Sequence, residues 1–344
     1  MKVLVTKPKG TEVYNTFFSD RAIAEIEKIG EVIYNPFDRE FTEDELKEAL
    51  KDIDVVFTGW GAPKYDANIL EYADKLKIVA HTGGSAAGIV SEEFQKRNLM
   101  LLTGNRLYAE SVAEGALCYI LLSQRKMLGD IQRTKEIGWP DIYVHNKGLK
   151  GKVVGLIGFG MIAENLARIL TAFDCKIKIC SGHLAPETAA KYNAEKCSID
   201  EIFETCDIVS VHTALNDKSY HSIGKELFDK MKDDSLIINT ARGAVINEAE
   251  MIEVLKTGRI RAILDVYENE PLPMDSGLRG LDNVILMPHR GGPTTDVREW
   301  VTIELAQDVK KFFEGETELK HQISLEYASR MTDETKFKKQ LGGW

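Results

Sequence analysis

The stretch Val153-Val154-Gly155-Leu156-Ile157-Gly158-Phe159-Gly160-Met161-Ile162-Ala163 decides how this chain folds. Residues 153–157 are apolar apart from one glycine and rich in β-branched side chains, which predicts a buried strand. The strand runs directly into a turn that contains two glycines, and apolar residues at helical spacing begin directly after the turn. A strand, a glycine turn and a helix in this order are typical of a unit that binds a dinucleotide.

Each small residue of this turn has a physical reason to be there. Gly158 permits the tight turn, Gly160 lets the backbone approach a pyrophosphate, and Ala163 lets the helix pack closely on the strand. The first N–H groups of the helix lack partners within the helix and lie at the positive end of its dipole. We therefore predict that residues 158–162 hold the phosphates of a dinucleotide.

The next predicted strand ends without the acidic residue that usually holds the ribose. That acid stands roughly 20 positions after the glycines, but residues 176–180 run into Ser181-Gly182-His183. An acid there hydrogen-bonds the ribose 2′-hydroxyl of NAD, and it would repel the extra phosphate of NADP. The cofactor is therefore predicted to be NAD or NADP, with NADP slightly favoured, and Ser181 and His183 are predicted to contact its ribose.

The same alternation of strand-like and helix-like segments extends along the rest of the chain. Strands are predicted at 2–6, 54–58, 78–80, 99–102, 152–157, 176–180, 207–211, 235–239, 261–265 and 283–286, and helices at 20–29, 108–128, 161–172 and 295–313. A capping box at Thr42 opens one further helix. This alternation indicates parallel sheets that are covered on both faces. The charged tail after about residue 315 supports no prediction.

Composition limits the class of protein. A chain of 344 residues is long enough for two domains. Its 44 Lys and Arg against 54 Asp and Glu give a net charge of −10, which argues against nucleic acid or an anionic membrane as a partner. No signal peptide or membrane span is predicted. The five cysteines are odd in number and form no Cys-x-x-Cys pair, so we expect reduced core thiols, no zinc site and a cytoplasmic protein.

Polar residues cluster where three predicted strands of the second half end. The segments are Asn239-Thr240-Ala241-Arg242-Gly243, Leu264-Asp265-Val266-Tyr267-Glu268-Asn269-Glu270 and Met287-Pro288-His289. Ligands of open α/β sheets bind outside the carboxyl ends of the strands. We therefore expect the charged side chains of these segments to converge on one cleft, and the candidates are Arg242, Asp265, Glu270 and His289.

These side chains suit the reduction of a 2-keto acid by hydride. A carbonyl that receives hydride needs a proton donor near neutral pH, which histidine supplies. A carboxylate beside His289 would keep the imidazole protonated and oriented. The planar fork of Arg242 suits a substrate carboxylate and polarises the neighbouring carbonyl. Each residue alone has a structural explanation, but together with a cofactor turn they predict a dehydrogenase.

Taken together, the motifs resemble those of the D-isomer-specific 2-hydroxyacid dehydrogenases, from the Gly83-Gly84 loop to about residue 313. The resemblance implies that Arg242, Glu270 and His289 are catalytic, and that Arg242 and His289 also contact the substrate. It implies that the backbone of Gly83, Gly84 and Ser85 holds the substrate carboxylate. The further cofactor contacts that it implies are Ser111, His212, Thr213, Ala214, Thr240, Ala241 and Asp265, the last facing the nicotinamide. The family's acidic residue shortly after the glycine loop is replaced by Ala87.

The resemblance also implies an architecture of two doubly wound parallel-sheet domains. A Rossmann cofactor domain, residues 104–295, is inserted into a flavodoxin-like substrate domain that comprises residues 1–103 and 296–344. The chain passes between the two predicted domains twice, near residues 103 and 296, and these two connections could act as a hinge for closure of the cleft. Since the family is commonly dimeric, we expect a homodimer, with the helix at 108–128 contributing to its interface.

Several alternatives remain open. Formate dehydrogenases of the same superfamily pair the histidine with a glutamine, so Glu270 disfavours them. Phosphoglycerate dehydrogenase is a rival, because compact forms exist beside those with a regulatory domain. Glyoxylate or hydroxypyruvate reduction gains from Ser181-Gly182-His183, which resembles the turn of some NADP-preferring members. A non-catalytic, dinucleotide-sensing scaffold can keep the same charged residues, but the chain shows no basic patch that would favour it.

Overall fold

The structure is a computed structural model that describes residues 1–139 and 146–333. It forms two compact units, of which the first contains Met1–Tyr108 and the chain from Pro293, and the second contains Ala109–Gly292. The sequence analysis predicted domain boundaries after residues 103 and 295. The observed boundaries fall five residues later and three residues earlier, respectively. The roles of the two units, one for substrate and one for cofactor, remain predictions, and residues 334–344 of the predicted substrate domain lie outside the described residues.

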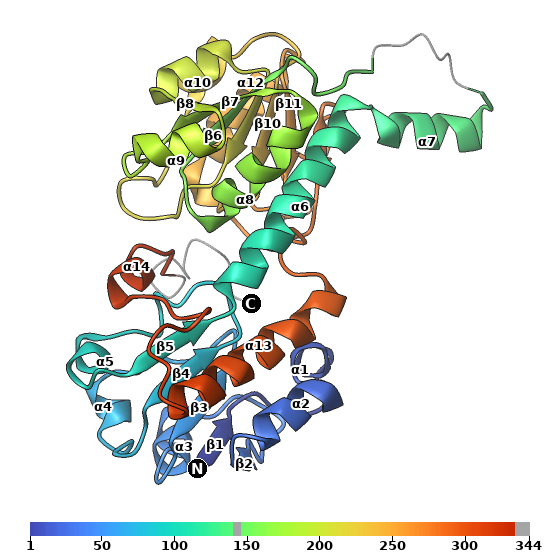
Figure 1. The fold of residues 1–344 in the computed structure, drawn as a ribbon. Helices are drawn as coiled ribbons and strands as arrows, with labels where there is room; N and C mark the ends of the chain where they lie inside the picture. The colour runs from blue at the N-terminus through green and yellow to red at the C-terminus, as the bar shows by residue number, and fades with distance from the viewer. Residues whose placement is uncertain (140–145, 334–344) are drawn as a thin grey trace. The chain divides into compact units, whose positions relative to one another are not determined.

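The first unit is built on a five-stranded sheet in which every strand pair is parallel (Figure 1). Its strands are β1 (Lys2–Val5), β2 (Glu31–Tyr34), β3 (Val55–Thr58), β4 (Ile78–His81) and β5 (Met100–Thr103). Their order, β2-β1-β3-β4-β5, is that of flavodoxin-like folds, as predicted. The sequence analysis missed β2, an edge strand whose apolar run, Val32-Ile33-Tyr34, is only three residues long and only partly buried.

The helices of the first unit begin where the sequence supplies caps. They are α1 (Glu12–Phe17), α2 (Asp20–Glu27), α3 (Glu43–Ala49), α4 (Ala67–Leu70), α5 (Glu92–Lys96), α13 (Thr295–Phe313) and α14 (Leu325–Ser329). Ser19 caps α2, and Thr42 forms the predicted capping box with Glu45 at the start of α3. The helix α13 packs against α1 and α2, and Val301, Leu305 and Val309 on α13 are buried in the core of this unit (Figure 1).

The second unit carries a seven-stranded sheet whose strand pairs are also all parallel. Its strands are β6 (Val153–Ile157), β7 (Lys176–Cys180), β8 (Ala194–Lys196), β9 (Ile208–Val211), β10 (Leu236–Asn239), β11 (Arg261–Leu264) and β12 (Val284–Leu286). The order β12-β11-β10-β9-β6-β7-β8 is the Rossmann order extended by one strand, which confirms the predicted fold class. The short edge strand β8 was not predicted.

The helices of this unit correct two predictions. They are α6 (Asn105–Gln124), which starts in the first unit, α7 (Met127–Glu136), α8 (Met161–Leu170), α9 (Pro186–Lys191), α10 (Ile199–Thr205), α11 (Lys225–Lys230) and α12 (Glu248–Leu255). The helix predicted over about 108–128 is confirmed up to Gln124, but its predicted end is wrong, because Lys126 adopts a left-handed backbone conformation (φ 53°) that separates α6 from α7. The core thiols are also only partly confirmed, since Cys206 is buried but Cys118 is exposed.

No helix in the part of the chain that the structure describes is long and apolar enough to cross a membrane.

Candidate active site

The glycine turn after β6 has the shape that its sequence predicted. Gly158 has φ 87°, and a Cβ atom there would lie 2.9 Å from the carbonyl carbon of His212. Gly160 occupies the N-cap of α8 and offers no side-chain cap, and the first N–H groups of a helix have no partners within the helix itself. Ala163 is fully buried between this helix and the sheet. The turn therefore fits the pyrophosphate of a dinucleotide, which would lie against residues 158–162.

The turn after β7 holds Ser181 and His183, the two predicted ribose contacts. The Ser181 hydroxyl accepts a hydrogen bond from the His183 N–H (3.3 Å), while Gly182 and His183 are exposed. Lys196 on β8 reaches the same turn, where its Nζ donates to the Leu184 carbonyl (3.1 Å). The sequence did not reveal this cation, because Lys196 is brought to the turn only by the pairing of β7 with β8.

The segment after β9 lies against the glycine turn. The Thr213 hydroxyl donates to the Ile157 carbonyl (3.2 Å), and a Cβ atom on Gly158 would lie 2.9 Å from Thr213 Oγ1. His212 Nε2 lies 2.9 Å from the Ser210 hydroxyl, and burial lowers the pKa of His212 to about 4, so its imidazole is neutral near pH 7. The structure thus brings residues 158 and 212–213 together, and Ala214 follows them in the same partly buried loop.

The loop after β10 carries Arg242. The Asn239 side chain holds this loop, because its Nδ2 donates to the Arg242 carbonyl (2.9 Å) and its Oδ1 accepts from the Ala241 N–H (3.0 Å). A Cβ atom on Gly243 would lie 1.9 Å from the Tyr267 carbonyl carbon, so only glycine lets the two loops approach this closely. Among the described residues, Thr240 Oγ1 is a buried hydroxyl oxygen without a hydrogen-bond partner. Such an orphaned group is consistent with a ligand contact here.

Glu270 and His289 form the pair that the sequence predicted. His289 Nδ1 lies 2.7 Å from Glu270 Oε2, and the side chains are 36% and 7% exposed, respectively. The other carboxylate oxygen of Glu270 accepts the Tyr267 N–H (3.0 Å), which fixes the acid from within the turn. His289 adopts φ 52°, a left-handed conformation that is rare for residues other than glycine. A buried carboxylate therefore orients a histidine that is itself accessible.

Asp265 holds the loop that follows this histidine. Its buried carboxylate accepts the N–H groups of Arg290 (2.8 Å) and Gly291 (2.6 Å) and the hydroxyl of Tyr119 (3.2 Å). Ser111 contacts the same loop, because its hydroxyl donates to the Gly292 carbonyl (3.3 Å). The sequence predicted Asp265 but missed Tyr119, since no local pattern marks an aromatic residue on α6 as the partner of an acid 146 positions away. The predicted contact of Asp265 with a nicotinamide remains a prediction.

The predicted carboxylate-binding loop lies in the first unit, directly after β4. Gly83 packs against His81, since a Cβ atom on this glycine would lie 2.2 Å from His81 Nε2. Burial and the nearby Lys7 lower the pKa of His81 to about 3, so the ring under the loop is neutral. The Ser85 hydroxyl donates to the Thr332 carbonyl (2.7 Å), a contact from the C-terminal tail that the sequence did not predict.

A second histidine–glutamate pair was also missed. His221 Nε2 lies 2.7 Å from Glu268 Oε1, only two positions from Glu270 along the chain. The backbone N–H of His221 donates to the Ala244 carbonyl (2.8 Å), so this pair supports the loop that carries Arg242. His221 lies outside the three strand-end segments that indicated Arg242, Glu270 and His289, so the sequence analysis did not single it out.

Sequence comparison places the chain among known proteins. The family model described as "D-isomer specific 2-hydroxyacid dehydrogenase, NAD binding domain" matches residues 117–291. A glyoxylate reductase of Thermococcus litoralis is 32% identical over 280 residues, which are 79% of this chain and 84% of that protein. A hydroxypyruvate reductase of Thermotoga maritima is 35% identical over 272 residues, which are 78% of this chain and 87% of that protein.

A longer relative and a solved structure extend the comparison. A D-3-phosphoglycerate dehydrogenase of Methanocaldococcus jannaschii is 32% identical over 320 residues, and the match covers 92% of this chain but only 58% of the length of that relative. The crystal structure of D-mandelate dehydrogenase from Rhodotorula graminis superposes with a TM-score of 0.78 at 23% identity, covering 94% of this chain and 97% of that one. This structural likeness confirms the fold.

Proposed function

The chain belongs to the D-isomer-specific 2-hydroxyacid dehydrogenases, oxidoreductases that transfer hydride between a nicotinamide cofactor and a 2-hydroxy or 2-keto acid, and we propose that it reduces small, unphosphorylated 2-keto acids such as glyoxylate or hydroxypyruvate. The observation that carries this proposal is the contact of 2.7 Å between His289 Nδ1 and the buried carboxylate of Glu270. A histidine held in this way is a proton donor matched to a carbonyl that is being reduced.

The roles of the three catalytic residues follow from their chemistry. The bound nicotinamide supplies the hydride. Arg242 binds the substrate carboxylate through its planar fork and polarises the carbonyl beside it. His289 Nε2 donates a proton to the carbonyl oxygen, while Glu270 holds Nδ1 and stabilises the charged imidazolium. The product is the 2-hydroxy acid, and in the reverse direction the neutral imidazole accepts the hydroxyl proton.

The second unit supplies the groups that would hold the cofactor. The N–H groups at the start of α8 suit its pyrophosphate, and the buried, unpartnered hydroxyl of Thr240 supports a contact nearby. We assign the substrate carboxylate to the backbone of Gly83, Gly84 and Ser85 in the first unit. These assignments make the first unit the substrate domain and the second the cofactor domain.

NADPH is the cofactor that the turn after β7 favours. Ser181 replaces an acid that would repel a 2′-phosphate. The side chain of Lys196, on β8, reaches the same turn and donates to the Leu184 carbonyl (3.1 Å). We expect Ser181→Asp to raise the NADH-over-NADPH ratio of kcat/KM, mainly by weakening NADPH. The matched control is Ser198→Asp at the exposed start of α10, which leaves the ratio unchanged. A wild type that rejects NADPH a hundredfold would contradict the assignment.

Contacts around Trp60, in the loop after β3, support an unphosphorylated substrate. Lys7 donates to the Trp60 carbonyl (2.8 Å) and is paired with Glu40. The guanidinium of Arg298 lies 5.5 Å from the ring centroid of Trp60 and 5.6 Å from that of Phe17. Of the two cations that contact Trp60, Lys7 is already neutralised by Glu40, which makes it a poor partner for a phosphate dianion.

The decisive experiment is a substrate screen of the purified protein with NADH and with NADPH. The panel contains glyoxylate, hydroxypyruvate, pyruvate, a bulky 2-keto acid and 3-phosphohydroxypyruvate, and the configuration of each product is determined. The proposal predicts the highest kcat/KM for glyoxylate or hydroxypyruvate and a D-configured product wherever the product is chiral. A preference for 3-phosphohydroxypyruvate would identify a phosphoglycerate dehydrogenase instead. Absence of turnover with every member of the panel would favour a non-catalytic sensor.

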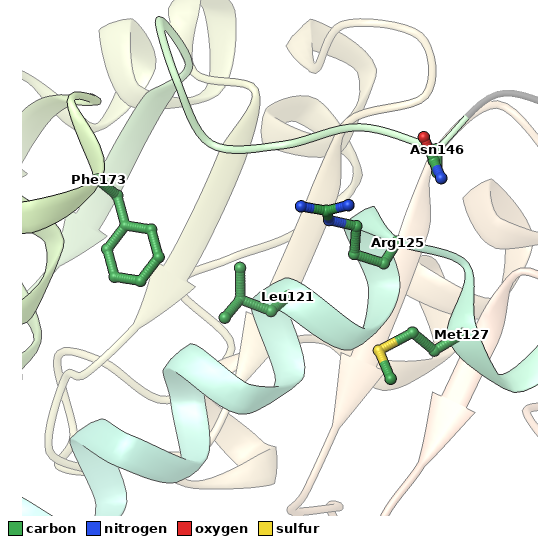
Figure 2. A pocket seen from close by; sticks show the side chains of 5 residues that line it. All are labelled: Leu121, Arg125, Met127, Asn146 and Phe173. Atoms are coloured by element: carbon green, nitrogen blue, oxygen red, sulfur yellow. The ribbon is translucent and has the colours of Figure 1, made fainter.

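The helix α7 supports the proposed homodimer. None of the residues of this helix, all within the described part of the chain, is buried, and in Figure 1 it extends away from the seven-stranded sheet. Met127, Leu128 and Ile131 on α7 are nonetheless apolar, with 46%, 47% and 49% of their surfaces exposed. Beside them lies a pocket of about 540 Å³ lined by Leu121, Arg125, Met127, Asn146 and Phe173 (Figure 2). Such a face is typical of a surface covered by a second copy of the chain.

Light scattering after size exclusion tests the dimer. The wild type is expected at twice the chain mass of 38.6 kDa, and Leu128→Glu combined with Ile131→Glu is expected at the mass of one chain. The control Gln132→Ala removes a polar side chain from the same helix and leaves the dimer intact. A wild type that elutes as a monomer would contradict the proposal. We also propose a cytoplasmic location, which the five free cysteines support.

A further inference from the structure

The tail that follows α13 is attached to the first unit by a buried histidine. We name residues 319–333 the C-terminal strap. The N–H and the Nδ1 of His321 both contact Asp308 Oδ2, at 2.7 and 3.0 Å, and its Nε2 lies 3.0 Å from Glu304 Oε2. Asp308 and Glu304 lie one turn apart on α13, and His321 is buried. The start of the strap is therefore fixed to a long helix.

The strap then covers the edge of the sheet at β5. Gln322 forms an antiparallel bridge with Leu102, and the Thr103 N–H donates to the His321 carbonyl (3.0 Å). Further along, Ile323 and Ala328 are buried in the hydrophobic core of the first unit. The strap is thus an integral part of this unit, with both backbone and core contacts.

The end of the strap reaches the loop that we assign to the substrate carboxylate. The buried Thr332 accepts the Ser85 hydroxyl on its carbonyl oxygen (2.7 Å). The Sδ atom of Met331 accepts the Ala86 N–H (3.5 Å). Two consecutive residues of the strap therefore contact two consecutive residues of the loop, 247 and 245 positions away in the chain.

The same loop is fixed from its other side by β4. The neutral, buried ring of His81 fills the space next to Gly83. The loop is thus held between the His81 ring and the strap. Because glycine gives this loop little stiffness of its own, its shape depends on these two supports.

We propose that the C-terminal strap is a positioning element of the substrate-carboxylate loop, in which Met331 and Thr332 hold Ser85 and Ala86 so that the loop N–H groups converge on the carboxylate. The inference rests on the proposed function of this loop. It assigns a role to a segment that supplies no catalytic group. It also explains why Ser85 serves the substrate through its backbone, since its hydroxyl donates to the strap.

The test compares variants that remove single contacts with one that removes the end of the strap. Ser85→Ala removes the hydroxyl and Ser85→Thr restores one, Met331→Ala removes the sulfur, and a chain ending at Arg330 lacks both strap residues. Ser329→Ala is the control, because its exposed hydroxyl contacts only the strap itself, at the Glu326 carbonyl. The measurements are KM and kcat for the best 2-keto acid, the Kd of oxamate in the presence of reduced cofactor, and the Kd of the reduced cofactor alone.

The proposal predicts effects on binding of the acid and little else. We expect KM and the oxamate Kd to rise roughly 2- to 12-fold in Ser85→Ala, the range for loss of one neutral hydrogen bond, and further in the truncated chain. Ser85→Thr recovers most of this loss. The kcat and the cofactor Kd stay within about threefold of the wild type, and Ser329→Ala matches the wild type throughout. Unchanged KM and oxamate Kd in the truncated chain, or a parallel loss of cofactor affinity, would overturn the proposal.

Hydrogen exchange separates this inference from the proposed function. Amide protons of residues 84–86 are expected to exchange faster in the truncated chain than in the wild type, whatever substrate the enzyme uses. Faster exchange together with a wild type inactive on every 2-keto acid would overturn the proposed function while keeping the strap–loop contact. Unchanged exchange would overturn the strap as a support of the loop.

Discussion

Two histidine–glutamate pairs lie in the second unit, and they are similar by every local measure. His289 contacts Glu270 and His221 contacts Glu268, each at 2.7 Å. Both histidines adopt a left-handed backbone conformation, with φ 52° and 50°. The two glutamates are separated by only one residue, so the two pairs share a single turn after β11.

The surroundings of the pairs differ. Glu270 is 7% exposed and its second oxygen is held by the Tyr267 N–H, whereas Glu268 is 26% exposed. The Glu268 carboxylate accepts the Glu248 N–H (3.0 Å), and the Glu248 carboxylate accepts the Glu268 N–H (3.1 Å). Burial, together with the negative charge of Glu268, raises the pKa of Glu248. The His221 ring is stacked on Tyr220, with centroids 4.0 Å apart. The His289–Glu270 pair therefore contains a buried acid that is fixed by a backbone N–H. The His221–Glu268 pair is partly exposed and supports the Arg242 loop.

The largest expected difference concerns the histidines themselves. We expect His289→Asn to lower kcat for keto-acid reduction by roughly 100- to 10,000-fold, the usual contribution of a general acid. His221→Asn is the matched variant, and because its pair only supports a loop we expect activity within about fivefold of the wild type. Steady-state kinetics with the best substrate of the screen measures both. Equal losses in the two variants would remove the distinction between the pairs.

Arg242 tests whether the loop supported by the second pair carries the substrate contact. We expect Arg242→Lys to lower kcat/KM by roughly 100- to 1000-fold, as for loss of one transition-state contact, because an ammonium cannot reproduce a two-pronged hydrogen bond. Arg259→Lys, at a guanidinium that contacts the Phe228 and Met231 carbonyls, serves as the control for a general loss of arginine. An Arg242→Lys enzyme within threefold of the wild type would exclude Arg242 from the site.

The glutamates are distinguished by pH rather than by rate. A carboxylate next to an imidazole favours the protonated, charged imidazole. Without the carboxylate, the histidine should lose the proton that keto-acid reduction needs at a lower pH. We expect Glu270→Gln to move the alkaline limb of the kcat/KM profile for keto-acid reduction to lower pH, with less effect on oxidation of the hydroxy acid, which uses the neutral base. Glu268→Gln should leave this limb in place. An unmoved limb in Glu270→Gln would mean that Glu270 does not act on His289.

The smallest expected effect concerns the aromatic residue near each pair. The Tyr119 hydroxyl contacts Asp265, whose carboxylate holds the Arg290 and Gly291 N–H groups directly after His289. We expect Tyr119→Phe to lower kcat by at most roughly 10-fold: a hydrogen bond to a charged acceptor is worth about 1.5–3 kcal/mol, but Asp265 keeps the two backbone N–H groups that hold the loop. Tyr220→Phe, which keeps the stacked ring beside His221, should have no effect on kcat. A Tyr119→Phe enzyme with wild-type kcat would show that Asp265 holds the loop without this hydroxyl.

Much of the site could be predicted from the sequence because it depends on local patterns. The turn at Gly158 could be predicted because a strand, glycines and a helix follow one another in the sequence. Arg242, Glu270 and His289 could be predicted because each follows a predicted strand. Parallel strands present their carboxyl ends at one edge, so this topology gathers residues whose order along the chain is known. The edge strands β2 and β8 were missed, since both are only partly covered: β8 has no apolar run, and the run in β2 is only three residues long.

The sequence by itself determined the two parallel sheets, the cofactor turn and the identity of the charged residues, since these follow from periodicity and from chemistry at strand ends. Only the tertiary structure decided that His221 contacts Glu268, which residues hold the loop after His289, and that the strap reaches Ser85. These contacts join residues as far apart as 146 positions for Tyr119 and Asp265 and 247 positions for Ser85 and Thr332. No local pattern encodes such contacts, because they form only when packing of separate elements brings the partners within hydrogen-bond distance.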